Sequence, residues 1–129
     1  MQSIWTSRTT WLRIAFLCAL AFALFMALVP KPPHLPIDEL GDKFEHSLAF
    51  LILTLLAAIS YPSMPLPRVG ERLSFLGAMI EVTQSIPALH RDCDILDWVV
   101  DTTVILVTLV VVWAYRRIRS PRSIANAIR

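Results

Sequence analysis

Residues 95–115 read ILDWVVDTTVILVTLVVVWAY, a stretch long and apolar enough to cross a lipid bilayer as a single helix. A spanning helix needs about 20 residues at a rise of about 1.5 Å per residue. Two acids, Asp97 and Asp101, interrupt the first third of this stretch. Ionisable groups at that depth are costly unless they face one another or a wet cavity. The stretch therefore predicts a membrane-spanning helix with a buried polar site beside it.

Three further apolar runs occupy residues 11–29, 44–61 and 69–86, and Pro62 and Pro87 follow the last two. Hydrophobic residues make up 56% of the 129-residue chain and charged residues only 17%, which is typical of an integral membrane protein. We predict an all-α polytopic membrane protein with about four transmembrane helices in one domain, residues 1–129. A cleaved signal peptide is the alternative for the first run. Its A-x-A-like sites lie inside the run, which favours an uncleaved helix.

The distribution of basic residues predicts the orientation. Nine arginines lie at or near the N-terminal end (Arg8, Arg13), around the start of the third run (Arg68, Arg72) and in the tail at 116–129 (five), whereas three basic residues lie in the two other connections. The positive-inside rule then places both termini in the cytoplasm and the connections at 30–43 and 87–94 outside. Trp113 and Tyr115 would belong to the cytoplasmic aromatic belt and Trp98 to the outer one.

With this orientation, polar residues of three helices gather near the outer surface. His46 begins the second helix, Glu81 and Gln84 lie near the end of the third, and Asp97 and Asp101 begin the fourth. We expect Glu81 and Asp101 at a similar depth. On the third helix, small or polar residues recur at helical spacing and predict an inward-facing stripe (Ser74, Gly77, Ala78, Glu81, Gln84, Ser85).

Several of these residues also have a purely structural interpretation. Asp42 suits the first turn of a helix, where its charge complements the dipole. Lys43 and Arg91 could anchor the interface or pair with Glu45 and Asp94. His46 and Gln84 could make hydrogen bonds between helices. Cys18 and Cys93 are too far apart in the predicted topology to favour a disulfide.

The motif-bearing part of the chain, residues 40–105, resembles the VanZ-like family of small polytopic membrane proteins. That family carries D-K-x-x-H, E-x-x-Q, R and D-x-x-x-N-T in this order, and this chain has Asp42-Lys43-x-x-His46, Glu81-x-x-Gln84, Arg91 and Asp97-x-x-x-Asp101-Thr102. Asp101 stands where the family often has Asn, and Val104 where it often has a packing Gly. The resemblance implies a location in the bacterial cytoplasmic membrane. It also raises glycopeptide antibiotic resistance as a role.

The function that we expect is binding or modification of an envelope lipid or lipid-linked saccharide in an outward-facing polar pocket. Asp42, Lys43, Gln84 and Arg91 are the expected substrate-binding residues. An acid–base or metal-dependent membrane hydrolase or transferase is the alternative, and a small transporter or an assembly subunit is a further one. The catalytic candidates, and the ligands if a metal binds, are His46, Glu81, Asp97 and Asp101. The sequence assigns no cofactor. Membrane lipids are the expected partners, and the sequence is compatible with a homo-oligomer. Because no basic stripe with interleaved aromatic residues is present, we do not expect binding to nucleic acid.

Overall fold

The computed structural model describes residues 2–30, 33, 36, 41–90 and 93–120, and within them it is all-helical with no strand. Side chains are described from residue 8 onward, except that of Asp42. Four long helices follow one another, with a short 3-10 turn before the last. They are α1 (Gln2–Leu28), α2 (Asp42–Ser60), α3 (Leu66–Gln84), η2 (Pro87–Leu89) and α4 (Ile95–Ile118).

Three of these helices contain segments long and apolar enough to cross a membrane: Arg8–Leu28, Lys43–Ser60 and Ile95–Ile118. The prediction of an all-α fold with apolar helices of membrane-spanning length is therefore confirmed for three helices. Helix α1 begins at Gln2, well before the predicted start at residue 11, because helical structure continues into a polar segment that an apolar pattern does not register. Helix α3 is not among the three segments.

Backbone chemistry explains where the helices begin. Gly41, with φ of 94°, precedes α2, and this positive φ is readily reached only without a side chain. Pro65 precedes α3, and Pro67 lies in its first turn, where a missing amide donor costs nothing. Asp94 caps α4 by accepting a hydrogen bond of 2.9 Å from the Leu96 amide.

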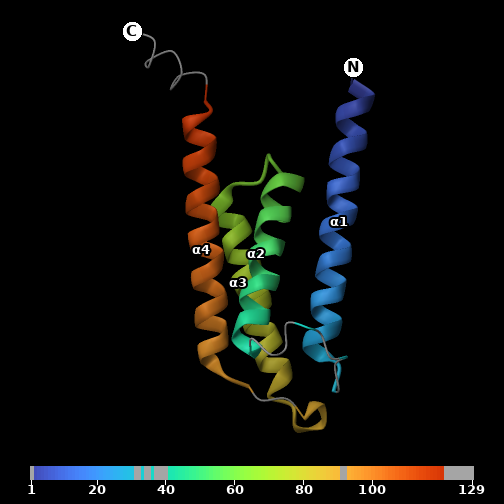
Figure 1. The fold of residues 1–129 in the computed structure, drawn as a ribbon, viewed down its shortest axis with the longest axis vertical. Helices are drawn as coiled ribbons and strands as arrows, with labels where there is room; N and C mark the ends of the chain where they lie inside the picture. The colour runs from blue at the N-terminus through green and yellow to red at the C-terminus, as the bar shows by residue number, and fades with distance from the viewer. Residues whose placement is uncertain (1, 31–32, 34–35, 37–40, 91–92, 121–129) are drawn as a thin grey trace.

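Consecutive helices run antiparallel, so that the start of α1 and the end of α4 lie at the same end of the bundle (Figure 1). Helix α4 packs against α2 and α3, and α1 packs against α2 and α3. The bundle thus has two chemically different ends. One carries the start of α3 and the arginines of α1 and α4, and the other carries the starts of α2 and α4 with the end of α3.

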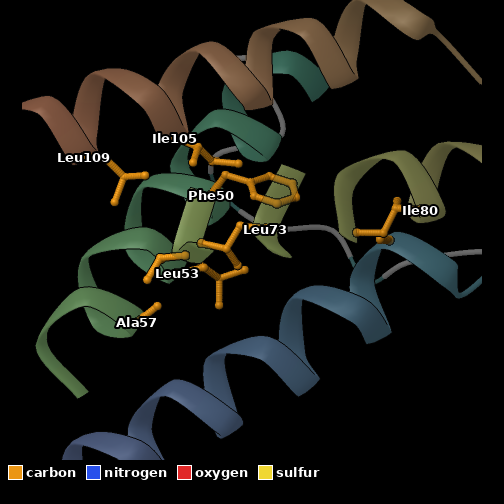
Figure 2. Packing of buried hydrophobic residues seen from close by; sticks show 9 residues of the cluster. Phe50, Leu53, Ala57, Leu73, Ile80, Ile105 and Leu109 are labelled. Carbon is orange, nitrogen blue, oxygen red and sulfur yellow. The ribbon is translucent and has the colours of Figure 1, made fainter. Parts of the chain in front are cut away.

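Apolar side chains fill the centre of the bundle, and Figure 2 shows Phe50 and Leu53 of α2, Leu73 of α3 and Ile105 and Leu109 of α4 close together. A glycine permits the close contact between α3 and α4. A Cβ atom added at Gly70 would lie 2.9 Å from Leu109 Cδ1, closer than carbon atoms normally pack. The tight approach of these two helices therefore depends on a glycine of α3.

Arginines of α1 and α4 donate hydrogen bonds to backbone carbonyls at the end of α2. Arg13 Nε donates to Ser60 O at 3.3 Å, and Arg116 Nη2 donates to Ala58 O at 2.8 Å. The last carbonyls of a helix have no partner within it, and positive charge there complements the dipole. Helix α2 has no basic residue in its own last turn, so that neighbouring helices supply the donors.

Candidate functional site

Ionisable side chains from three helices meet at the end of the bundle opposite the arginines. We call this group the polar cluster; its described members are Lys43, His46, Glu81, Asp94, Asp97 and Asp101. The antiparallel topology explains the meeting, because the starts of α2 and α4 and the end of α3 lie at that end (Figure 1).

Lys43 joins the start of α2 to the start of α4. Its Nζ lies 2.9 Å from Asp94 Oδ2 and also forms an ion pair with Asp97 Oδ1. The Lys43 side chain is 53% exposed, whereas the Asp97 side chain is 6% exposed. Burying the Asp97 carboxylate is tolerable because this ammonium partner lies beside it. The ion pair therefore stands at the boundary between the bundle interior and its surroundings.

His46 and Asp101 form a second, deeper pair between the same helices. His46 Nδ1 lies 3.4 Å from Asp101 Oδ2, and both side chains are largely buried. His46 follows Lys43 by three residues on α2, and Asp101 follows Asp97 by four on α4. These are the spacings of one helical turn, so the two pairs are stacked along the bundle.

Glu81 of α3 completes the polar cluster and is 4% exposed. Its Oε2 accepts a hydrogen bond of 3.1 Å from the Asp94 amide. Its Oε1 is buried and has no hydrogen-bond partner among the described residues. The carboxylate is also close enough to interact electrostatically with Asp97 and His46. Its hydrogen bond joins it to the start of α4, whereas Asp101 lies further along that helix beside His46.

Three expected binding residues have different outcomes. Gln84 is buried and its Nε2 donates to Ala27 O at 2.9 Å, so that it ties α3 to the end of α1. The backbone of Asp42 begins α2, but its side chain lies outside the described residues, as does the whole of Arg91. The stripe on α3 is largely as expected, with Gly77, Glu81 and Gln84 buried, except that Ser85 is exposed.

Two residues make contacts beyond those expected of them. Asp94, expected as an ion-pair partner of Lys43 or Arg91, binds Lys43 and in addition caps α4 and donates its amide to Glu81. Its position directly before an apolar helix is a cap signal. Trp98, expected in the outer aromatic belt, is half-buried and its Nε1 donates to Ser74 O at 3.0 Å. Ser74 Oγ also lies 2.9 Å from Thr102 Oγ1, which strengthens the contact between α3 and α4.

Two groups beside the membrane-spanning segments have shifted pKa values. The hydrogen bond from Lys43, followed by the one from the Leu96 amide, holds the pKa of the Asp94 carboxyl below its ordinary value. Loss of water contacts, followed by the hydrogen bond and negative charge of Glu81, raises the pKa of the Cys93 thiol. Charged groups of the polar cluster contribute to both pKa shifts.

The described part of the chain holds an apolar cleft apart from the polar cluster. No set of three or more His, Cys, Asp or Glu side chains in the described part of the chain is arranged to hold a metal ion. An apolar cleft of about 360 Å³ lies elsewhere, between α3 and α4, where Gly70, Ser74 and Leu109 are among its lining residues. It does not include the polar cluster.

Comparison with protein-family models, with curated proteins and with solved structures finds no match to this chain. The chemistry of the polar cluster must therefore be argued from its own geometry.

Proposed function

We propose that this chain is a VanZ-like protein of the bacterial cytoplasmic membrane, with four spanning helices and both termini in the cytoplasm. We further propose that its polar cluster binds the headgroup of an envelope lipid or lipid-linked saccharide in the outer leaflet. A separate observation supports each of three parts of this proposal: the insertion of α3 into the membrane, the orientation of the bundle and the nature of the ligand.

The surface of α3 supports its insertion as a fourth spanning helix. Phe75 is 68% exposed and Val82 62% exposed, whereas Glu81 is 4% exposed. A helix on the surface of a water-soluble protein has the opposite arrangement, with polar residues outward and apolar residues inward. In a bilayer, an apolar outer face and a polar inner face are favourable.

The separation of charge between the two ends of the bundle supports the orientation. The described arginines lie in the first half of α1, the first turns of α3 and the last turns of α4, which all share one end. Arg117 and Arg119 also lie over the rings of Trp113 and Tyr115, at 5.2 and 5.0 Å from the ring centroids. Basic and aromatic residues together are typical of the cytoplasmic interface.

Buried Glu81 is the observation that carries the ligand proposal. Its Oε2 is held by the Asp94 amide, while Oε1 is a buried acceptor without a partner among the described residues. Leaving a buried acceptor unpaired costs about 1–3 kcal/mol, and a bound donor would recover that energy. The Lys43 side chain, which pairs with Asp97 in the same cluster, is 53% exposed, and this exposure supports access of a lipid headgroup to the polar cluster.

The proposal is tested by measuring which lipids remain bound to the purified full-length protein, with native mass spectrometry and lipid extraction. Glu81→Gln keeps the shape of the side chain and removes its charge. The matched control is Glu71→Gln, an exposed residue of the same type near the opposite end of the same helix. We expect Glu81→Gln to lose a lipid class that the wild type and Glu71→Gln retain. Identical lipid content in all three proteins would refute headgroup binding by the polar cluster.

Acid–base catalysis on such a lipid is the second candidate, and the His46–Asp101 pair favours it. A carboxylate next to one imidazole nitrogen orients the ring and leaves the other nitrogen to exchange a proton with a bound lipid. Incubation of the purified protein with extracted envelope lipids tests this candidate. Conversion that is lost in His46→Gln would support catalysis, and the absence of any conversion by the wild type would leave binding alone.

A further inference from the structure

We propose that the polar cluster recognises a primary ammonium group, an inference that rests on the proposed headgroup-binding function and names the chemistry of that headgroup. The proposal follows from three features of the polar cluster. It already binds the Lys43 ammonium, its described members include more carboxylic acids than basic groups, and Glu81 has an acceptor atom without a hydrogen-bond partner among the described residues.

Lys43 shows that the polar cluster accommodates a primary ammonium. Its Nζ is bound by Asp94 Oδ2 and Asp97 Oδ1 together, from the N-cap and the first turn of α4. Two carboxylates that converge on one nitrogen suit a group with several N–H donors and a localised positive charge. A lipid headgroup with the same terminal group would find the same kind of acceptors.

The balance of charge favours a cationic group over an anionic one. The described members comprise four carboxylic acids, which are Glu81, Asp94, Asp97 and Asp101, against Lys43 and His46. Three of these acids are almost completely buried, with Glu81, Asp97 and Asp101 at 4%, 5% and 2% exposure. Clustered carboxylates in a poorly hydrated setting attract an additional positive charge.

Glu81 distinguishes a primary ammonium from a quaternary one. Its Oε2 accepts from the Asp94 amide and the Cys93 thiol also hydrogen-bonds to the carboxyl group, whereas Oε1 is a buried acceptor without a partner among the described residues. A primary ammonium has N–H groups to donate to Oε1, whereas a trimethylated ammonium has the same charge and none. Quaternary ammonium groups are recognised mainly through aromatic faces, and the described members of the polar cluster offer carboxylates.

A primary ammonium is found on ethanolamine phospholipids and on soluble amines, and the experiment separates these sources. The full-length protein is placed in nanodiscs that contain phosphatidylethanolamine, phosphatidylcholine or phosphatidylglycerol, and the lipids retained are quantified by native mass spectrometry. Phosphatidylethanolamine and phosphatidylcholine differ only in the substitution of the nitrogen. Free ethanolamine is then added as a competitor. If millimolar ethanolamine displaces the lipid, the free amine is sufficient for binding to the polar cluster. If the lipid stays bound in the presence of ethanolamine, the intact lipid is the source of the ammonium group.

We expect the wild type and Glu71→Gln to retain phosphatidylethanolamine about tenfold better than phosphatidylcholine, and Glu81→Gln to lose this preference. If phosphatidylglycerol or phosphatidylcholine were preferred in a Glu81-dependent manner, the ammonium inference would be wrong while headgroup binding would stand. If no lipid were retained in a Glu81-dependent manner, both would be wrong.

A second variant keeps the inference testable if Glu81→Gln does not fold. Lys43→Ala removes the internal ammonium and leaves Asp94 and Asp97 without it. We expect Lys43→Ala to unfold at a lower temperature than the wild type. Methylammonium should raise the unfolding temperature of this variant towards that of the wild type, whereas tetramethylammonium at equal concentration should not. Equal restoration by both ions, or by neither, would overturn the preference for a primary ammonium.

Discussion

Gln84 Nε2 donates a hydrogen bond to Ala27 O across 2.9 Å and thereby joins the end of α3 to the end of α1. Ala27 lies in the last turn of α1, where carbonyl groups lack a partner within the helix. Both residues are buried, so water does not readily replace the bond. A residue expected to contact ligand thus serves to hold α1 against the rest of the bundle.

Replacing Gln84 should therefore destabilise the protein. We expect Gln84→Leu to lower the free energy of unfolding by about 1 kcal/mol, because a buried carbonyl loses its donor and interhelical hydrogen bonds in membranes are of modest strength. Unfolding in mixed detergent micelles, followed by circular dichroism, measures the change. Thr83→Val, at a partly exposed position one residue away, controls for general effects at this end of α3. Equal stability of Gln84→Leu and the wild type would contradict this role.

Gly70 should resist enlargement because of Leu109. A Cβ atom at position 70 would lie 2.9 Å from Leu109 Cδ1, the far end of a flexible side chain. We expect Gly70→Leu to cost about 1–3 kcal/mol as an overpacked core substitution. The double variant Gly70→Ala with Leu109→Ala should be less destabilised than the sum of the two single variants, because the pair is in direct contact. Additive effects would show that the two helices do not approach as closely as described.

Arg116 should contribute to stability in a way that its neighbour does not. Arg116 Nη2 donates to Ala58 O at 2.8 Å, whereas Arg117 lies over the Trp113 ring at the same end of α4. We expect Arg116→Gln to lower the free energy of unfolding by about 1 kcal/mol more than Arg117→Gln, since only the first removes a charged donor from the end of α2. Thermal unfolding of the two variants, which have the same net charge, provides the comparison.

Cys93 offers a test of orientation and of its contact with Glu81. In a Cys18→Ser background, Cys93 is the only thiol, and a membrane-impermeant maleimide should label it in intact cells if the 87–94 connection faces outward. The raised pKa of the Cys93 thiol means less thiolate at a given pH, so labelling should be slow at pH 7 and become faster as the pH rises. Labelling only after cell lysis would refute the proposed orientation.

The same thiol reports on the charge of Glu81. Because the Glu81 carboxylate contributes to the raised pKa of Cys93, Glu81→Gln should lower that pKa and accelerate labelling at pH 7. The exposed Glu71→Gln, near the other end of α3, should leave the rate unchanged. An unchanged rate in Glu81→Gln would show that the two side chains do not interact.

Hydrophobic patterning predicted most of the helical structure, because apolar runs of spanning length and prolines at their ends are local properties. The bounds of α2 and α4 differ from the prediction by a few residues. Helix α1 extends beyond its apolar run, and the 3-10 turn at Pro87–Leu89 was not predicted. The first difference arises in a polar segment, which has no apolar periodicity, and the second is a turn of three residues, too short to show a periodicity.

What the sequence by itself determined is the membrane class, the order of the helices and the end of the bundle that carries the acids. Helical rise and alternating direction suffice for these, since an antiparallel bundle brings Lys43, Glu81 and Asp97 to one end whatever the details of packing. Only the tertiary structure decided the pairing within that end. That pairing comprises the ion pairs of Lys43 with Asp94 and Asp97, the contact of His46 with Asp101, and the hydrogen bond from Gln84 to Ala27. These contacts depend on the rotation and separation of neighbouring helices. Those are fixed by contacts such as Gly70 against Leu109, which join residues far apart in the chain and have no signature in local spacing.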